Sequence, residues 1–331
     1  MYGLGQVDSS TIKCRMRACS YLTVAQLFLQ DNFLLERPLS FDDIKPRLLG
    51  HWGTCDGINL FYANFQAAFL NHPDFHLVIG PGHGFPALQA NLLIDGELAK
   101  VDTQATPDAR GIAYICRHFS WPNGFPSHAS PLTPHVICEG GELGYALATA
   151  YGFVLGQPQR TVAVLIGDGE FETATTLASL NLNKLLASTS HGQIIPVLHL
   201  NGYKISGPTI SARKSERELS ELLRGFGFTP IFIRGSDPDL FQYAIAQARQ
   251  LLTPSNIHSP SFQPPFLIFK TPKGFTGPSE IHGQKVSGNF RSHQIPLPHA
   301  KTDALELAIL SDWLKSYRFD QLFNSQEGFT L

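Results

Sequence analysis

The sequence lacks a surplus of charge of either sign, since 25 Lys and Arg residues stand against 27 Asp and Glu, for a formal net charge of −2. This balance offers no basic surface for nucleic acid or for an anionic membrane, so a small molecule or a protein is the expected partner. The cysteines are few, odd in number and widely spaced, without a CxxC pair: Cys14, Cys19, Cys55, Cys116 and Cys138. We interpret them as reduced cytoplasmic thiols rather than as a zinc or disulfide framework.

Long hydrophobic runs are also missing. No stretch approaches the roughly 18 uninterrupted apolar residues that span a bilayer, and the N-terminal sequence MYGLGQVDSSTIKCRMR lacks the apolar core of a signal peptide. We therefore expect a chain that is not exported. Hydrophobic residues nevertheless make up 43% of the chain and charged residues 16%, which favours a globular protein with a buried core over a disordered one.

Several short apolar runs have the length of buried strands, at residues 75–80, 161–167, 194–200, 228–233 and 265–270. Segments with helical spacing lie between them, at residues 142–156, 172–187, 215–225 and 238–252. Because strand and helix alternate, the sequence predicts an α/β fold with a mainly parallel sheet and helices on both faces. Two Gly- and Pro-rich stretches, 80–135 and 271–298, carry little periodicity, and we interpret them as functional or linking loops.

The stretch TVAVLIGDGEFETATTL (161–177) runs from an expected strand straight into Gly167-Asp168-Gly169. Ligands of open parallel sheets bind beyond the carboxyl ends of the strands. The glycines allow close approach of the backbone to a ligand, and Asp168 offers a hard oxygen to a divalent cation. A purely structural turn is the alternative for this short pattern.

The next expected strand ends in Asn201, 33 positions after Asp168, and Tyr203 follows two residues later. A carboxylate, an amide oxygen and a main-chain carbonyl from adjacent strand ends suit an octahedral Mg²⁺ whose other ligands are diphosphate oxygens and water. The spacing resembles the thiamine-diphosphate motif, in which an Asn follows GDG at a similar distance.

A second motif lies in CEGGELGYALATAYGFVLG (138–156), where Gly140 and Gly141 precede a helical segment. Exposed main-chain N–H groups and the positive end of a helix form a seat for a diphosphate. A simple tight turn is again the alternative.

Together these motifs make the chain from about Ile12 to Phe323 resemble the N-terminal, diphosphate-binding part of phosphoketolase, a relative of transketolase. The matching phrases are LLGHWGTCDG (48–57), GPGHG (80–84), WPNGFPSHASPLTP (121–134), EGGELGY (139–145), GDGE (167–170), HLNGYKISGPT (199–209), LLRGFGF (222–228), KTPKGFTGP (270–278) and FRSHQIPLP (290–298). The resemblance implies a thiamine-diphosphate- and Mg²⁺-dependent lyase. Its expected substrates are xylulose 5-phosphate or fructose 6-phosphate together with inorganic phosphate, and its expected products are acetyl phosphate and an aldose phosphate.

Four histidines lie inside these phrases, in irregular Gly- or Pro-rich segments: His51, His83, His128 and His293. The resemblance implies that they form a catalytic cluster around the substrate hydroxyls and the reactive carbon. Histidine suits proton transfer near neutral pH because its unperturbed pKa lies there.

The resemblance also implies roles at the cofactor for Gly169 and Lys273. Lys273 is expected to help neutralise the diphosphate, with a solvated lysine at a strand end as the alternative. Glu142 and Glu170 are expected either to orient the cofactor or to bind neighbouring main-chain amides.

By the same resemblance we expect an N-terminal helical segment (1–40), a diphosphate- and Mg²⁺-binding α/β domain (41–298), and a C-terminal linker helix and tail (299–331). The pyrimidine-binding domain of phosphoketolases, with the glutamate that activates the cofactor, is expected to lie on a partner chain, so that this chain is one subunit of a split enzyme. A fragment of a longer protein and a non-catalytic cofactor-binding module are the alternatives. We expect association, as a homodimer or with the second half.

Smaller departures from the family pattern concern the substrate. Phe85 follows GPGHG where the family commonly has glycine, which would strain the backbone if that position needs a positive φ. Ala174-Thr175 and Leu180-Asn181 replace a Gly-Pro and a Trp-His pair. These changes leave a transketolase-like transfer of a two-carbon unit as an alternative reaction.

Overall fold

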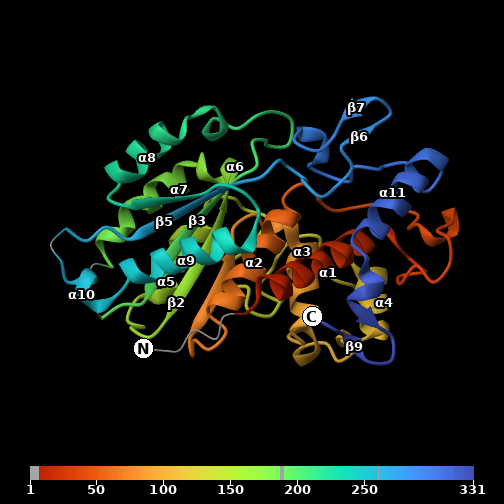
Figure 1. Ribbon diagram of the computed structural model, residues 1–331, viewed down its shortest axis with the longest axis horizontal. Helices are drawn as coiled ribbons and strands as arrows, with labels where there is room; N and C mark the ends of the chain where they lie inside the picture. Colours follow the sequence, from red (N-terminus) through yellow and green to blue (C-terminus); the bar gives the residue numbers. More distant parts are fainter. Residues whose placement is uncertain (1–6, 187–189, 260) are drawn as a thin grey trace. The chain divides into compact units, whose positions relative to one another are not determined.

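The computed structural model describes residues 7–186, 190–259 and 261–331 (Figure 1). Internal contacts divide the chain into two compact units, each built from three separate stretches. Unit 1 comprises Met1–Ser9, Leu60–Gly82 and His135–Thr271, and unit 2 comprises Ser10–Asn59, His83–Pro134 and Pro272–Leu331. The boundaries expected from the sequence (1–40, 41–298 and 299–331) remain a prediction, and the first begins outside the described residues. No helix within the described ranges is long and apolar enough to cross a membrane.

Unit 1 is built around a five-stranded sheet in which every strand pairs in parallel and the order is β1-β2-β3-β5-β4. Its strands are β1 (Phe75–Ile79), β2 (Thr161–Gly167), β3 (Gln193–Leu200), β4 (Thr229–Ile233) and β5 (Pro265–Lys270). Each strand expected from the apolar runs is confirmed to within one residue at either end. A parallel sheet has to be covered on both faces, which explains why these strands are apolar throughout rather than alternating.

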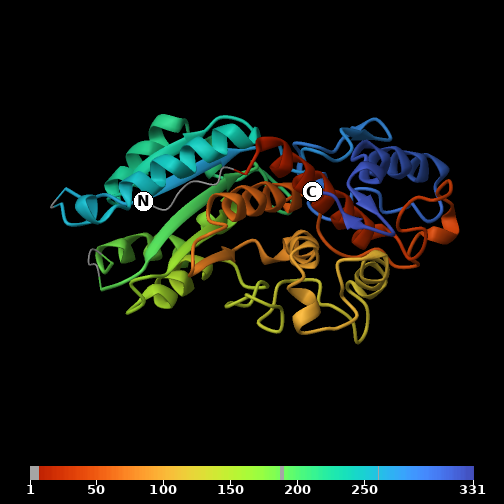
Figure 2. The ribbon, with the colours of Figure 1, turned by 60° about the horizontal axis from the view of Figure 1, so that its bottom comes forward.

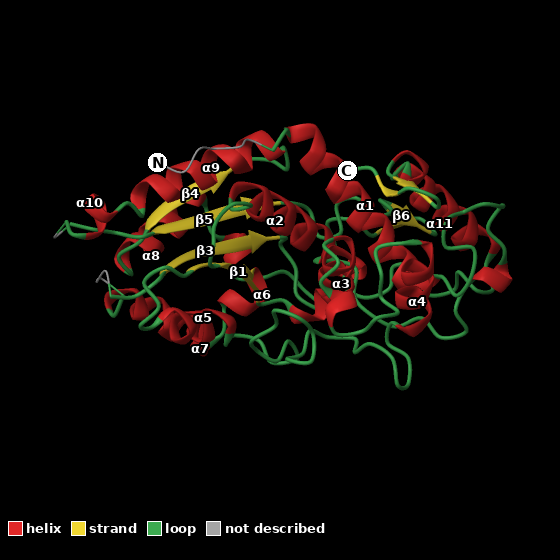
Figure 3. Cartoon of the chain, turned by 90° about the horizontal axis from the view of Figure 1, so that it is seen from below, coloured by secondary structure: helices red, strands yellow, loops and turns green. Residues whose placement is uncertain are grey.

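Alternate residues of each strand pack on opposite faces of this sheet. Val162, Val164 and Ile166 of β2 join one core, which also contains Leu219 and Leu223 of α8 (Glu216–Gly225). On the other face Phe269 of β5 contacts Phe241 of α9 (Pro238–Leu251), with ring centroids 5.1 Å apart. Figure 3 shows α9 on one side of the sheet and α5 (Ala146–Val154) and α7 (Ala174–Ser179) on the other. The predicted α/β fold with helices on both faces is therefore confirmed.

The described part of unit 1 contains further helices, most of them short. They are α5 (Ala146–Val154), α6 (Asp168–Phe171), α7 (Ala174–Ser179), α9 (Pro238–Leu251) and α10 (Pro254–Ile257). The helix expected over 172–187 is broken instead into α7 and a 3₁₀ turn, η4 (Leu180–Lys184), and its last residue lies outside the described part of the chain. Capping residues fix where α8 and α9 begin. Ser215 caps α8, and Asp237 caps α9, which has a proline in its first turn.

Unit 2 is mainly helical, with α1 (Ser9–Phe28), α3 (Phe85–Ile94), α4 (Ala109–His118) and α11 (Ala304–Ser316), while α2 (Cys55–Ala68) contributes residues to both units. The interpretation of residues 80–135 as a long loop is wrong, because α3 and α4 both lie in that stretch. Phe85 begins α3 without a positive φ and stacks on Phe119, so no strain arises there. An apolar α3 that is buried all round shows no helical periodicity, which is why the sequence pattern missed it.

The C-terminal segment packs within unit 2. Figures 1 and 2 show α1 (red) beside α11 (dark blue). Phe28 meets Trp313 edge to face at 6.0 Å, and Tyr21 stacks on Phe319 at 4.1 Å. After α11 the chain forms a 3₁₀ turn, η7 (Phe319–Gln321), and a two-stranded hairpin of β8 (Phe323–Asn324) and β9 (Gly328–Phe329), so the polar tail expected after the helix is partly structured. A second small hairpin, β6 (Glu280–Ile281) and β7 (Gln284–Lys285), precedes α11.

Candidate functional site

Asp168 lies at the carboxyl end of β2 and is almost fully buried, with 2% of its surface exposed. Its Oδ1 accepts a hydrogen bond from Gly169 N (3.0 Å), and its Oδ2 accepts from Gly202 N (2.7 Å) and from Thr209 Oγ1 (3.2 Å). A carboxylate that receives several N–H and O–H donors is fixed in orientation. The two donors to Oδ2 come from the loop after β3, so the ends of β2 and β3 are tied together at Asp168.

Asn201 follows β3 directly, and β2 and β3 run in register from Thr161↔Gln193 to Gly167↔His199. The Asn201 side chain is buried, and its Oδ1 accepts a hydrogen bond from Tyr203 N (3.1 Å). In this pairing Asp168 therefore stands one residue beyond the last paired residue of β2, and Asn201 stands two residues beyond that of β3. Tyr203 forms an isolated bridge with Pro208, which folds this loop back on itself.

The Gly140-Gly141 segment lies against the turn after β1. A Cβ built on Gly82 would lie 2.2 Å from Gly140 Cα, so the two backbones approach as closely as glycine allows. A Cβ on Gly141 would have nothing within 4 Å, and Gly141 and Glu142 are both exposed. This open stretch leads into α5, whose N-cap residue Tyr145 provides no side-chain cap.

Glu170 binds neighbouring main-chain amides, which is one of the two roles expected for it. Its Oε1 accepts a hydrogen bond from Gly144 N (3.2 Å) and its Oε2 from Gly167 N (3.3 Å). Burial raises the pKa of Glu170 to about 7, while these amide hydrogen bonds act in the opposite direction. The side chain thereby fastens the loop that contains the glycine pair to the end of β2.

These residues of unit 1 suit a magnesium–diphosphate group. The candidate ligands are a buried carboxylate and a buried amide oxygen, which are the hard donors that Mg²⁺ prefers. The open backbone at Gly141 offers N–H groups to an anion ahead of α5, while Glu170 accepts from Gly144 N and Ala146 N at the start of that helix. The chemistry of the donors and the space at Gly141 therefore fit the group that the sequence motif implies.

The four motif histidines come together in unit 2, although they are far apart in the sequence. The ring centroid of His51 lies 5.1 Å from that of His83, 5.3 Å from that of His128 and 5.1 Å from that of His293. The centroids of His83 and His293 are also 5.1 Å apart. The Nδ1 atoms of His51 and His293 are buried and have no hydrogen-bond partner in the described part of the chain, whereas His128 Nδ1 pairs with Ser127 Oγ at 2.9 Å.

Burial, together with nearby positive charges, keeps His51, His83 and His293 of this cluster neutral. Desolvation, then the charges of His128 and Lys273, lowers the pKa of His51 to about 4. Desolvation and Lys273 lower the pKa of His293 to about 3, and the pKa of His83 falls well below its usual value for the same kinds of reason. Neutral imidazoles at pH 7 carry one nitrogen that can accept a proton and one that can donate a hydrogen bond.

Lys273 lies with these histidines in unit 2 and is 2% exposed. The alternative of a solvated lysine is thus excluded. A Cβ on Gly53 would lie 2.8 Å from Lys273 Cε and 2.7 Å from Ser292 O, so Gly53 leaves the space that the lysine stem fills. The role of Lys273 at a diphosphate remains a prediction, whereas its electrostatic effect on the histidines follows from its position.

A buried network next to this cluster was not expected from the sequence. Asp56 accepts hydrogen bonds from Ser20 Oγ (2.8 Å) and from the N–H (3.0 Å) and hydroxyl of Thr276, and burial raises its pKa to about 6. Thr276 Oγ1 lies 2.6 Å from the Tyr317 hydroxyl, which accepts a bond from Trp313 Nε1 (2.9 Å). The network holds the loop that contains Lys273. In the sequence, the Asp-Gly pair inside LLGHWGTCDG is the only sign of this hydrogen-bond network.

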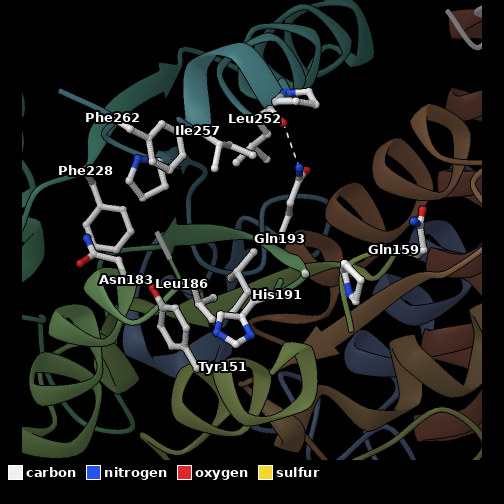
Figure 4. A pocket seen from close by; sticks show the side chains of 15 residues that line it. Tyr151, Gln159, Asn183, Leu186, His191, Gln193, Phe228, Leu252, Ile257 and Phe262 are labelled. Atoms are coloured by element: carbon white, nitrogen blue, oxygen red, sulfur yellow. Dashed lines mark hydrogen bonds between the residues drawn. The ribbon is translucent and has the colours of Figure 1, made fainter. Parts of the chain in front are cut away.

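The sheet of unit 1 also has a cavity at the opposite, amino-terminal ends of its strands (Figure 4). It measures about 300 Å³ and includes Tyr151, Asn183, His191, Gln193 and Phe228 in its lining. Among the described lining residues there is no lysine, arginine or carboxylate, so this cavity offers no charged partner for a sugar phosphate.

A family model described as the XFP N-terminal domain matches residues 6–330. A "Probable phosphoketolase" of Rhodopseudomonas palustris (strain BisB5) is 43% identical over 324 residues, which are 95% of this chain and 41% of that relative. A "Probable phosphoketolase" of Pseudomonas putida F1 is 43% identical over 338 residues, with 97% of this chain and 42% of the relative covered. The chain thus spans about two fifths of the length of these curated relatives.

Solved structures with the same fold include transketolases. The transketolase from Leishmania mexicana matches with a TM-score of 0.60 and 17% identity, and a transketolase mutant from Pichia stipitis matches with a TM-score of 0.61 and 14% identity. Each comparison covers 95% of this chain and 45% of the other. At this level of identity the likeness concerns the fold.

Proposed function

The chain belongs to the XFP N-terminal domain family, and from this membership we propose that it is the diphosphate-binding part of a thiamine-diphosphate-dependent phosphoketolase. The names of its curated relatives support this assignment. The reaction is the cleavage of a ketose phosphate, xylulose 5-phosphate or fructose 6-phosphate, with inorganic phosphate as the second substrate. The products are acetyl phosphate and an aldose phosphate.

Unit 1 holds the cofactor by its diphosphate in this proposal. Asp168, Asn201 and the main-chain carbonyl of Tyr203 bind Mg²⁺, while the amides after Gly140 and Gly141 and the N-terminus of α5 face the diphosphate. Gly169 keeps the backbone beside Asp168 free of a side chain. When bound, thiamine diphosphate supplies the electron sink for breaking the carbon–carbon bond.

The histidines of unit 2 bind substrate hydroxyls and move protons. The observation that carries this role is that neutral His51 and His293 each keep a buried Nδ1 without a hydrogen-bond partner among the described residues. A neutral imidazole nitrogen can accept the proton of a hydroxyl group, and its protonated form can return that proton to a leaving oxygen. Burial, with a contribution from the charge of Lys273, keeps these two histidines in their neutral form.

The pyrimidine-binding half, with its activating glutamate, is supplied by sequence outside this chain, and we place it on a partner polypeptide. General acid–base assistance of the kind this glutamate provides is typically worth about 10²–10⁴-fold in rate. Turnover by the present chain is therefore expected only when that half is added.

The test is to combine the chain with a polypeptide that carries the remaining half and to supply thiamine diphosphate, Mg²⁺, xylulose 5-phosphate and phosphate. Acetyl phosphate, trapped as its hydroxamate, is the expected product. Transfer of a two-carbon unit to an aldehyde would assign the chain to transketolase-like chemistry instead. If the chain bound the cofactor but gave no turnover with any added polypeptide, it would be a non-catalytic binding module.

A further inference from the structure

A second cluster of ionisable side chains lies in unit 2, where the β6–β7 turn approaches the first turn of α11. His282 Nε2 is 3.1 Å from Asp303 Oδ2 and 3.6 Å from Glu306 Oε1. Within the described part of the chain, these three residues are the one group of His, Cys, Asp or Glu whose ligand atoms all lie within 4.8 Å of one another. None of them belongs to the histidine cluster or to the strand ends of unit 1.

The oxygens that face His282 are not used elsewhere. Asp303 caps α11 through Oδ1, which accepts from Leu305 N (2.7 Å) and Glu306 N (3.3 Å), and so its Oδ2 is left for His282. Glu306 Oε2 accepts from His299 N at 2.6 Å, whereas its Oε1 faces His282 Nε2 at 3.6 Å.

Glu306 is 1% exposed, which makes its second oxygen the unusual feature of the group. Burying a carboxylate is unfavourable unless hydrogen bonds or a cation balance its charge. The imidazole nitrogen at 3.6 Å is beyond normal hydrogen-bond distance from Oε1. The ligand atoms of the three side chains all lie within 4.8 Å of one another, close enough to coordinate one ion.

We propose that His282, Asp303 and Glu306 form a binding site for Zn²⁺. One imidazole nitrogen and two carboxylate oxygens are zinc ligands, whereas Mg²⁺ and Ca²⁺ prefer oxygen alone. Metal–ligand bonds of about 2.0–2.2 Å in a tetrahedron place ligand atoms roughly 3.4 Å apart. The measured separations of 3.1 and 3.6 Å lie on either side of that value.

The site is reachable from solvent, because the His282 side chain is 49% exposed and that of Asp303 is 31% exposed. Water completes the coordination. Since its ligands come from the turn of one hairpin and from the start of α11, bound Zn²⁺ fastens these two elements together and stabilises the folded chain.

The turn itself offers a variant that removes the imidazole without strain. His282 and Gly283 are the two residues between β6 and β7, and both have positive φ, 48° and 74°. Two-residue hairpin turns of this kind favour Asn followed by Gly. His282→Asn should therefore fold at least as well as the natural chain while it loses the nitrogen ligand.

The experiment is calorimetric titration of the chain with ZnCl₂, alongside His282→Asn, Glu306→Gln and the control His258→Asn, which alters an exposed histidine of unit 1. We expect His282→Asn and Glu306→Gln to lose one zinc site or to bind it at least tenfold more weakly, and His258→Asn to match the natural chain. Added Zn²⁺ should raise the melting temperature of the natural chain and of His258→Asn, but not that of His282→Asn.

Unchanged stoichiometry and affinity in both His282→Asn and Glu306→Gln would overturn the proposal, because any bound zinc would then lie at other histidines or cysteines. Absence of zinc binding by the natural chain would overturn it equally. The melting temperature without metal shows whether each variant is folded, so loss of binding is not confused with loss of structure.

Discussion

The carboxylate of Asp168 accepts a 2.7 Å hydrogen bond from the main-chain N–H of Gly202, the residue directly after Asn201. This bond joins the carboxyl ends of β2 and β3 and fixes the orientation of a buried negative charge at the sheet edge. Such fixed, hard oxygen donors are what a magnesium–diphosphate group requires.

Gly82→Ala should destabilise the chain, because the new Cβ would lie 2.2 Å from Gly140 Cα, a backbone atom that cannot turn aside. The expected loss is about 1–3 kcal/mol in the free energy of unfolding, measured by denaturant titration. Gly141→Ala is the matched control, since a Cβ there meets nothing within 4 Å, and it should stay within about 0.5 kcal/mol. Equal effects of the two variants would contradict the close contact.

Tyr317→Phe should destabilise the chain by about 1–3 kcal/mol, because it leaves the buried Trp313 Nε1–H without its acceptor and removes the partner of Thr276 Oγ1. Thermal unfolding measures the loss. Tyr243→Phe, at a side chain that is 67% exposed, is the control and should be nearly neutral. A neutral Tyr317→Phe would mean that the Asp56–Thr276–Tyr317 network does not hold its loop.

The histidine cluster predicts loss of stability in acid. Because the folded pKa of His293 is lowered to about 3, from 6.5, the unfolded chain binds more protons between these values, and folding is favoured above them. The free energy of unfolding should therefore fall as the pH decreases below 6.5, by at most about 1.4 kcal/mol per pH unit for this group. His293→Gln should show a smaller slope in denaturant titrations at pH 7, 6 and 5. An unchanged slope would show that His293 is not buried in its neutral form.

Lys273→Met should raise the pKa of His293 above about 3 and that of His51 above about 4, because the positive charge beside them is lost while the side chain still fills its space. Titration of the histidine resonances by NMR measures both. Lys285→Met, at an exposed lysine of the β6–β7 hairpin, should leave them unchanged. If the pKa values of His293 and His51 were the same in the natural chain and in Lys273→Met, Lys273 would not be a cause of their lowering.

The sequence predicted unit 1 better than unit 2, for a physical reason. Buried parallel strands such as β2 are continuous apolar runs with turn residues at both ends. Their positions can therefore be predicted from a short stretch of sequence. Helix α3 is apolar on every side and lies between glycine- and proline-rich segments, so no periodicity marked it. The helix expected over 172–187 begins instead at Ala174, because Thr173 caps α7 by accepting a hydrogen bond from Thr176 N.

The candidate site was predictable to a different extent in each unit. Asp168 and Asn201 follow neighbouring strands, so elementary sheet geometry brings them together. His51 and His293 are 242 positions apart, and only the family resemblance grouped them before the structure was known. The hydrogen bonds of Asp56 to Ser20 and Thr276 depend on the packing of three distant segments, which no local pattern encodes.

The central claim is that Asp168 helps to hold Mg²⁺ and, through it, the diphosphate of thiamine diphosphate. Calorimetric titration with thiamine diphosphate and Mg²⁺, on the natural chain and on Asp168→Ala, tests it most directly. We predict saturable, Mg²⁺-dependent binding by the natural chain and a loss of at least tenfold in affinity for Asp168→Ala, with the folded fraction of each checked by circular dichroism. Binding that is equally strong in both, or that does not depend on Mg²⁺, would contradict the account.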